Sequence, residues 1–403
     1  MLAALAAGCF ESEGIDPPHD RFIYPVGIAV TNNGDYLMVV NSNFDLRYNA
    51  GTILMVDLEK VAATDGNIDD EADVLVKDSV LELGAYASDL KLTPDMSRAL
   101  IPVRGESAVL VVDISENGEI HCGEEEDLRC DGEHRIKSTE EFDLPIEPYI
   151  VTAAEFTYLP ENTTQTVTMG FITHLAGGEV SLACLDTRTP PSLIDVLDDL
   201  PEAVSGVAVQ PGTNIVFVTS RREPKVSRLR VVYGDAQFPC NRPYFYKLGS
   251  IPVAGLSSGI DSRDIAFSPD GDYAFVANRS PDSLVIINTS DSEPKNQVVS
   301  VVEMGSEPSL VVPHVQTEAD GSERLLVYVV CYNANRIYVV DPERREKESI
   351  IITGEGPHAL VFDPVRPRAY VTHFVENTIG VIDTHTGRMI QLIGNTERPE
   401  THD

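Results

Sequence analysis

The chain has 403 residues, 42% of them hydrophobic, and its 64 acidic and 30 basic residues give a formal net charge of −34 at pH 7. A surface this acidic repels nucleic-acid phosphates and anionic lipid head groups, which excludes nucleic acid as a partner. Solubility of an exposed protein explains the charge most simply, and a surface that collects cations is the alternative. The absence of Trp argues against repeats of the WD type.

The N-terminus reads MLAALAAGCFESEG. The small residues before Cys9 resemble the end of a bacterial lipoprotein signal, which predicts an acylated Cys9, a tether over residues 1–21 and membrane contact only through this lipid anchor. However, no basic residue precedes the apolar run, Ala6 stands where Leu is usual, and the run is too short to span a bilayer. A truncated start or an ordinary apolar terminus is the alternative. The lipoprotein hypothesis predicts export to the outer membrane, the cell surface or the periplasm.

Cys122 and Cys130 bracket an acidic stretch, HCGEEEDLRC. In an exported protein this close spacing predicts a local disulfide. Zinc with His121 and His134 as additional ligands is the alternative, but the spacing matches no standard zinc pattern.

Three other cysteines lie further along the chain. Cys184 and Cys240 could form a second disulfide. Cys331 lies in the apolar run LLVYVVCYN, so we expect a buried free thiol there.

Most of the chain consists of short runs rich in Val, Ile, Tyr and Phe, separated by Gly, Pro, Asn and Asp, which predicts an all-β protein. Residues 191–204, PSLIDVLDDLPEAV, are one of the few candidates for a short helix. In residues 63–73, ATDGNIDDEAD, acids and amides alternate as calcium ligands can. No EF-hand spacing follows, so a solvated acidic loop is the preferred interpretation.

One strand–turn–strand unit, RDIAFSPDGDYAFVAN at residues 263–278, recurs along the chain with a third strand after it. Further copies occupy residues 26–58, 88–114, 153–186, 205–232, 309–341 and 358–383. A fourth apolar run follows most copies, for example NQVVSVVEMG and KESIIITGEG. Each copy therefore predicts a four-stranded antiparallel meander, and the seven copies together predict a seven-bladed β-propeller.

The propeller accounts for residues 22–395 as a single domain and leaves residues 396–403 as a C-terminal tail. A β-sandwich is the alternative, but sandwiches do not usually repeat one motif seven times. The first and last copies contain all of their own strands, so we expect a ring without strand exchange, unless RFIY at residues 21–24 adds an edge strand.

The repeats resemble the YVTN-type repeats of surface-layer and lactonase-like seven-bladed propellers. The matching stretches are SPDGDYAFVANRSPDSLVIINTSD at 268–291 and DPVRPRAYVTHFVENTIGVIDTHTGRMIQLI at 363–393, where His373 replaces the usual Asn. The resemblance implies the fold over about nine tenths of the chain. Its members include binding proteins, cell-surface proteins, lactonases and cofactor carriers, so it does not specify the function.

Ligands of propellers usually bind at one mouth of the central channel, which is formed by residues after each second strand and before each first strand. After the second strands, the aligned copies place Asn41, Arg104, His174, Arg221, Arg279, Tyr332 and His373. Before the first strands, they place Tyr24, Tyr86, Tyr149, Arg263 with Asp264, Pro308 and His358.

From these positions we take eight candidate ligand-binding residues: Arg104, His174, Arg221, Arg263, Arg279, Tyr332, His358 and His373. Guanidinium groups suit carboxylate or phosphate ligands, so this mouth is predicted to bind an anion. The alternative is that the arginines only tie neighbouring blades together.

Three of these residues, His174, His358 and His373, raise the possibility of a metal or haem. Only His358 and His373 lie in one repeat, and the chain has no C-x-x-C-H motif for covalent haem. We therefore predict no cofactor and no metal site.

No nucleophile elbow and no phosphate-binding glycine loop is present in the sequence. The preferred hypothesis is a non-enzymatic cell-surface or periplasmic propeller that binds a small ligand or a protein partner. A lactonase-like hydrolase of a sugar-acid lactone is the alternative. Calcium-dependent lactonases need carboxylates and amides that converge in the channel. In this sequence the candidates for such groups are mainly Asn41, Asn278 and Asp264. A haem- or metal-carrying redox accessory protein is the third hypothesis.

Overall fold

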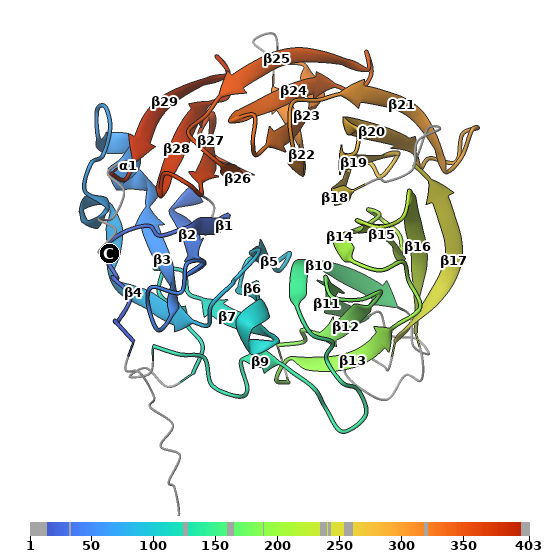
Figure 1. Cartoon of the computed structure of the whole chain (residues 1–403), viewed down its shortest axis with the longest axis horizontal. Helices are drawn as coiled ribbons and strands as arrows, with labels where there is room; N and C mark the ends of the chain where they lie inside the picture. The colour runs from blue at the N-terminus through green and yellow to red at the C-terminus, as the bar shows by residue number, and fades with distance from the viewer. Residues whose placement is uncertain are drawn as a thin grey trace, which may run out of the picture.

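The computed structural model describes residues 14–31, 34–123, 128–158, 165–187, 189–233, 240, 243–253, 261–317 and 321–395. These residues form seven antiparallel sheets in a ring (Figure 1). Within each sheet the strands follow chain order from the innermost strand to the outermost, so every blade is one contiguous segment. The predicted all-β seven-bladed propeller is confirmed.

Blades 1 and 2 are the least regular: helices interrupt blade 1, and several strands of blade 2 are only two residues long. Blade 1 consists of β1 (Pro25–Thr31), β2 (Tyr36–Asn41), β3 (Gly51–Asp57) and β4 (Leu75–Leu83), with α1 (Leu58–Ala63) and the 3₁₀ helix η2 (Glu71–Asp73) between β3 and β4. Blade 2 consists of β5 (Lys91–Leu92), β6 (Arg98–Val103), the 3₁₀ helix η3 (Arg104–Glu106), β7 (Ala108–Ile114), β8 (Ile120–His121) and β9 (Arg135–Ile136). Blade 3 consists of β10 (Pro148–Tyr158), β11 (Gln165–His174), β12 (Val180–Cys184) and β13 (Ser192–Leu197).

The remaining four blades are regular meanders. Blade 4 contains β14 (Val204–Val209), β15 (Ile215–Ser220), β16 (Lys225–Val232) and β17 (Tyr244–Pro252). Blade 5 contains β18 (Ser262–Phe267), β19 (Tyr273–Arg279), β20 (Asp282–Asn288) and β21 (Gln297–Glu303). Blade 6 contains β22 (Pro308–Thr317), β23 (Glu323–Cys331), β24 (Arg336–Asp341) and β25 (Glu346–Ile352). Blade 7 contains β26 (Pro357–Phe362), β27 (Arg368–His373), β28 (Thr378–Asp383) and β29 (Arg388–Ile393).

The apolar core is divided among the interfaces between blades. Each cluster of buried apolar side chains draws its members from two neighbouring blades; one joins Phe217 and Val226 of blade 4 to Ile265 and Val276 of blade 5. Blades 7 and 1 share such a cluster too. The second and third strands of a blade are covered on both faces, which explains why they read as continuous apolar runs rather than as alternating ones.

The helix expected within residues 191–204 is absent; this segment forms the outermost strand of blade 3, β13. Its run SLIDVL has apolar residues at spacings that also fit one face of a helix. This strand pairs with β12 along its length, and Leu193 is buried against blade 2. These tertiary contacts outweigh the weak helical pattern of the sequence.

The ring closes without strand exchange, because β1 packs directly beside β26 and each of their blades is complete (Figure 1). Residues 21–24, RFIY, add no strand. Phe22 is buried between blades 1 and 7, and the Ile23 amide donates to Asn41 Oδ1 at 3.0 Å. Side chains and isolated backbone bonds therefore join the two ends of the repeat.

A clasp formed by residues 64–68 and 391–394 holds the outer edge of this junction. Gln391 Nε2 donates to the carbonyls of residues 64 and 66 at 3.0 and 2.7 Å, and Asn67 Oδ1 accepts from the Leu392 amide at 3.0 Å. Ile68 forms a parallel bridge with Ile393. The acidic stretch thus serves ring closure, and the described residues contain no group of three or more His, Cys, Asp or Glu able to hold a metal.

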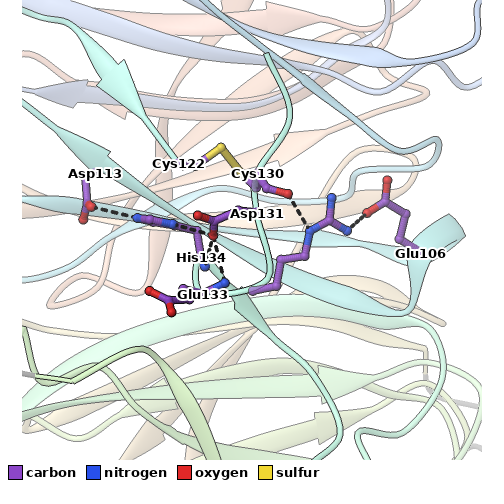
Figure 2. Close-up of a disulfide and its surroundings, with 8 residues drawn as sticks. Glu106, Asp113, Cys122, Cys130, Asp131, Glu133 and His134 are labelled. Atoms are coloured by element: carbon purple, nitrogen blue, oxygen red, sulfur yellow. Dashed lines mark hydrogen bonds and ion pairs between the residues drawn. A yellow bond between two sulfur atoms is a disulfide. The ribbon is translucent and has the colours of Figure 1, made fainter. Parts of the chain in front are cut away.

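A disulfide between Cys122 and Cys130 closes the loop that replaces a long fourth strand in blade 2 (Figure 2). Arg135 Nε donates to the Cys130 carbonyl at 3.0 Å and its guanidinium pairs with Glu106. The disulfide is the predicted one, and the zinc alternative is wrong because both sulfur atoms are consumed.

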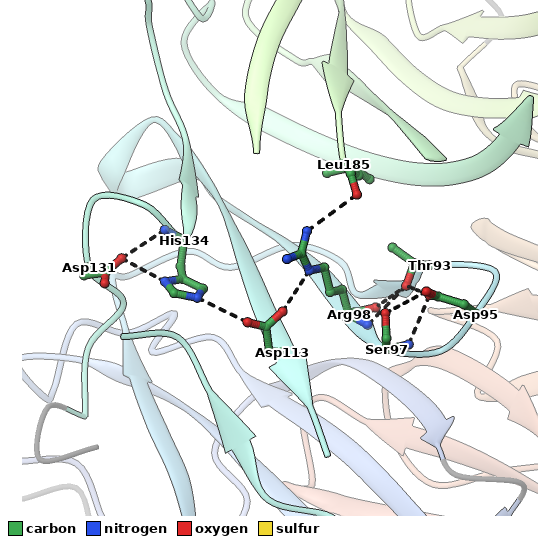
Figure 3. Close-up of polar contacts among 8 residues, drawn as sticks. All are labelled: Thr93, Asp95, Ser97, Arg98, Asp113, Asp131, His134 and Leu185. Atoms are coloured by element: carbon green, nitrogen blue, oxygen red, sulfur yellow. Dashed lines mark hydrogen bonds and ion pairs between the residues drawn. The ribbon is translucent and has the colours of Figure 1, made fainter. Parts of the chain in front are cut away.

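A charged chain joins this loop to the body of blade 2 (Figure 3). His134 lies between Asp131 at 2.8 Å and Asp113 at 3.2 Å, and Asp113 accepts from Arg98 Nε at 2.8 Å. Arg98 also donates to the Leu185 carbonyl of blade 3 at 3.5 Å. His134 therefore serves packing of the loop rather than metal binding.

A second disulfide joins Cys184 of blade 3 to Cys240 of blade 4, and Cys331 is a buried free thiol, as predicted. Burial raises the pKa of Cys331 to about 12, so its thiol is unreactive at neutral pH. Two disulfides indicate an exported, non-cytoplasmic protein. None of the helices within the described ranges has the length and hydropathy needed to cross a membrane. Cys9 and the tail at 396–403 lie outside the described residues.

Candidate functional site

One hydrogen bond recurs in all seven blades and marks the same end of each. A residue at the end of the second strand, or directly after it, donates its backbone N–H to the carbonyl of the residue directly before the first strand, or in blade 2 to that of Tyr86, five residues before β5. The seven donor–acceptor pairs are Ser42–Tyr24, Arg104–Tyr86, Leu175–Glu147, Arg221–Ala203, Arg279–Asp261, Tyr332–Glu307 and Phe374–Gly356, at 2.9 to 3.3 Å. This bond provides an exact alignment of the mouth positions.

Measured against this bond, the sequence alignment is wrong by one residue in blades 1, 3 and 7. The predicted Asn41, His174 and His373 are the residues before the donors Ser42, Leu175 and Phe374. Because successive residues of a strand point to opposite sides, the slip turns these three side chains away from the mouth. Arg104, Arg221, Arg279 and Tyr332 are true equivalents.

The two displaced histidines are buried structural groups. His174 and His373 have no exposed surface. His174 Nε2 bonds to Ser181 Oγ at 2.8 Å, while His373 Nδ1 bonds to Thr378 Oγ1 at 2.9 Å and its Nε2 accepts from the Gly354 amide at 3.1 Å. Burial lowers the pKa of each to about 4. Neither lines the mouth cavity, so both leave the candidate ligand-binding set.

A bulge at the start of the first strand determines which side chains reach the mouth. The pairing of the first two strands shifts register at this point in blades 1, 3, 4, 5, 6 and 7. In blade 5 the shift lies between Ser262 and Asp264, so Arg263 is the extra residue. A bulge re-aims side chains, and consecutive residues Arg263 and Asp264 both line the cavity as a result.

The cavity at the mouth has a volume of about 310 Å³. Five of the eight predicted site residues line it: Arg104, Arg263, Arg279, Tyr332 and His358. Tyr86, Tyr149 and Asp264, which the aligned repeats also placed there, line it too. The residues that the sequence did not indicate are chiefly Phe44, Phe374, Asp89 and Glu307.

Arginines form one wall of the cavity, and two of them also tie blades together. Arg104 pairs with Glu147 at 3.2 Å and Arg279 pairs with Glu307 at 3.3 Å; each glutamate lies just before the first strand of the next blade. Arg263 pairs with Asp261. The Nε atoms of Arg104 and Arg263 are buried and have no hydrogen-bond partner among the described residues.

Arg221 stands behind this wall and does not line the cavity. Its guanidinium carbon lies 4.7 Å from the centre of the Tyr149 ring, a cation–π arrangement. It forms no ion pair with a described residue. Burial, with a smaller contribution from the nearby positive charges of Arg263 and Arg279, lowers the pKa of Arg221.

Two carboxylates also line the cavity: Asp264 lies in the first strand of blade 5, and Asp89 lies just before that of blade 2. Asp264 is 9% exposed and accepts from the Val311 amide at 2.9 Å, and Asp89 accepts from the Val151 amide at 3.3 Å. Burial raises the pKa of Asp264 to about 6 and also raises that of Asp89, while Lys91 partly offsets both shifts. Neither carboxylate forms an ion pair within the part of the chain that the structure describes.

Aromatic side chains form the opposite wall. The Phe374 ring lies 5.3 Å from Phe44, 6.2 Å from Tyr332 and 6.1 Å from His358, between ring centres. Phe44 also contacts Tyr86 at 6.0 Å and is 52% exposed. Exposed aromatic faces of this kind can stack on a planar or apolar part of a ligand.

His358 is fixed at the edge of this wall by its bond to the Val26 carbonyl at 2.7 Å, which joins blade 7 to blade 1. Burial lowers its pKa, so the ring is neutral at pH 7 and contributes no positive charge to the mouth. The three histidines of the metal and haem hypothesis thus all hold structural hydrogen bonds.

Comparison with family models finds no match, and no curated protein matches the sequence. Among solved structures, hydrazine synthase from Kuenenia stuttgartiensis is 13% identical, with 94% of this chain and 99% of that one aligned at a TM-score of 0.59. The periplasmic gluconolactonase PpgL of Pseudomonas aeruginosa is 13% identical over 81% and 84%, with a TM-score of 0.56. The propeller domain of Cps50 (Swd1) from Myceliophteria thermophila is 12% identical over 90% and 98%, with a TM-score of 0.55. At these identities the likeness shows the fold alone.

Proposed function

We propose that this protein binds a small organic ligand at the mouth of its channel, with an anionic group of the ligand on the arginine wall. The cavity of about 310 Å³, with arginines on one side and exposed aromatics on the other, carries the proposal. Small-molecule sites are typically concave and largely apolar, with a few convergent polar groups. The strongly negative net charge of the chain disfavours anion binding over most of its surface, which makes arginines gathered at one mouth the more notable.

Thermal-shift screening of organic carboxylates and phosphates, followed by calorimetric titration, tests this proposal. We expect Arg263→Gln and Phe44→Ala to weaken a ligand that stabilises the wild type by tenfold or more. Arg230→Gln, which changes an exposed arginine on β16, is the matched control. Arg263→Lys keeps a positive charge beside Asp261. It therefore tests whether weaker binding by Arg263→Gln comes from misfolding after that ion pair is lost. Equal affinity in all four variants would place the site elsewhere.

A lactonase-like hydrolase is the second candidate, and Asp264 is the observation that favours it. A buried carboxylate whose pKa is raised to about 6 lies near the operating pH of a general base, inside the cavity that also presents guanidinium groups. Such a base could deprotonate water for attack on an ester carbonyl polarised by arginine. A pH-stat assay with sugar-acid lactones tests this; turnover that Asp264→Asn abolishes supports hydrolysis, and no turnover by the wild type supports binding alone.

We also propose that the protein is held at the outer membrane or cell surface through a lipid on Cys9. The sequence around Cys9 supports this, and the two disulfides are consistent with export. Intact-mass measurement of the native protein decides it: a diacylglyceryl adduct at Cys9 is expected, and an unmodified chain beginning at Met1 contradicts it.

A further inference from the structure

Of the four arginines at or just behind the rim of the mouth, one has no carboxylate in ion-pair contact among the described residues. Three lining arginines each have a carboxylate partner, whereas Arg221, stacked on the lining ring of Tyr149, has none among the described residues. The rim cations are Arg104, Arg221, Arg263 and Arg279, and the rim anions are Glu147, Asp261 and Glu307. One bound anionic group would balance the rim.

Two carboxylates of the cavity lack a counter-ion. Asp89 and Asp264, from blades 2 and 5, both line the cavity and accept backbone hydrogen bonds, but neither forms an ion pair with a described residue. A buried carboxylate without a counter-ion is costly, so this position favours a ligand group that carries positive charge.

The arginine wall and the carboxylates of the cavity lie next to each other. Arg263 and Asp264 are consecutive residues that the bulge in blade 5 turns into the same cavity. The aromatic wall with Phe44 and Phe374 faces the same space, and aromatic faces attract cations as well as apolar groups. A ligand with opposite charges on neighbouring atoms and an apolar body would satisfy all three features.

We propose that the ligand of the mouth is a zwitterionic amino-carboxylate with an apolar or aromatic side chain. Its carboxylate lies at the arginine wall beside Arg263, its ammonium group lies at Asp264 and Asp89, and its side chain lies against Phe44 and Phe374. This inference rests on the proposed function and specifies its ligand class. A neutral polyol would donate hydrogen bonds to Asp264 but would leave both carboxylates of the cavity without a counter-ion.

Three probes of similar size separate the charges: L-phenylalanine, 3-phenylpropanoate, which lacks the ammonium group, and 2-phenylethylamine, which lacks the carboxylate. Calorimetric titration of the full chain at pH 7.5 measures each affinity. We expect L-phenylalanine to bind at least tenfold more tightly than either analogue, because a charged hydrogen bond in a buried site is worth that factor or more.

Asp264→Asn identifies the group that recognises the ammonium. The amide keeps an oxygen for the Val311 N–H, so the first strand retains its bond. We expect the variant to lose at least tenfold in affinity for L-phenylalanine and to bind 3-phenylpropanoate as well as the wild type does, or better. Asp272→Asn, an exposed aspartate near the turn at the other end of the same hairpin, is the matched control and should change neither affinity.

The outcomes separate this inference from the proposed function. If 3-phenylpropanoate binds as tightly as L-phenylalanine, the mouth takes anions, and the zwitterion inference is wrong while the proposed function stands. If Asp264→Asn leaves the preference for L-phenylalanine unchanged, Asp264 is not the recognition group and the inference also fails. If none of the three probes binds at 10 mM, both proposals are contradicted for ligands of this size.

Discussion

At the residue scale, the position before the mouth donor is used for internal hydrogen bonding in blades 1, 3 and 7. Asn41, His174 and His373 all bond to a hydroxyl at the start of the third strand, on Thr52, Ser181 and Thr378 respectively. Sequence alignment predicted a polar residue near the end of each second strand, but it could not decide which of two adjacent residues faced the ligand. Loops of unequal length blur the alignment by one residue, and one residue reverses the side chain.

The buried histidines predict a loss of stability in mild acid. In the folded chain His174 and His373 have pKa values lowered to about 4, whereas an unfolded histidine titrates near 6.5. The unfolded state therefore binds more protons between these values, so their contribution is complete above about pH 6.5 and is lost as the pH falls toward 4. We expect His373→Asn to reduce the decrease in unfolding free energy between pH 7.5 and pH 5 by about 1 to 2 kcal/mol.

Denaturant titration of wild type and His373→Asn at both pH values measures this difference, and titrations common to both proteins, such as that of Asp264, cancel. Asparagine is the residue that blades 1 and 5 use at the same position, as Asn41 and Asn278. A parallel pH dependence of wild type and His373→Asn would show that the pKa of His373 is the same in the folded and unfolded states.

At the element scale, the meanders were predictable because each blade repeats one order of strand, turn and strand. The elements that escaped prediction depend on contacts between distant parts of the chain. Bulges at the first strands place Arg263 and His358 at the mouth, and the loops after second strands bring Phe44 and Phe374 to the same cavity. Nothing local in the sequence distinguishes a phenylalanine that lines a cavity from one that fills a core.

The clasp at residues 64–68 and 391–394 predicts a local weakness when its side chains are removed. Gln391→Ala leaves two carbonyls without their donor, and Asn67→Ala leaves the Leu392 amide without its acceptor. We expect each change to lower the free energy of unfolding by about 0.5 to 1.5 kcal/mol, because water can solvate the groups left at this exposed edge. We also expect faster hydrogen exchange in β29 and little change in the other blades.

Asp69→Asn, an exposed acid of the same segment, is the control and should exchange like the wild type. Calcium provides the second check, because a calcium site at residues 63–73 would raise the melting temperature on addition of the ion. We expect no rise. Exchange that accelerates equally in all blades would show that ring closure is not local to the clasp.

At the scale of the whole molecule, composition and repeat length sufficed for the architecture. The second and third strands read as long apolar runs because neighbouring blades cover both of their faces. This pattern can be recognised in one sequence without any structure. The distribution of charge over the folded molecule cannot be predicted from the sequence in the same way. A net charge of −34 says nothing of a mouth where arginines gather, because that arrangement comes only from folding.

The net charge predicts that salt stabilises the protein. Self-repulsion among excess carboxylates opposes the compact state, and ions screen it over about 10 Å at 0.1 M. We expect the melting temperature to rise by a few degrees between 10 mM and 300 mM NaCl, and KCl to act alike because the effect depends on ionic strength. A fall over this range would show that surface ion pairs, rather than repulsion, dominate the electrostatics.

The contiguous blades also have a consequence for chain order. Among the strands that the structure describes, no sheet combines distant segments, so none of these sheets fixes where the polypeptide must start. A circular permutant opened in the link between β21 and β22 would keep every blade intact. For the same reason, duplication or deletion of one contiguous segment would add or remove a whole blade without severing a hydrogen-bonded ladder, whereas a propeller closed by strand exchange must break a sheet to change size.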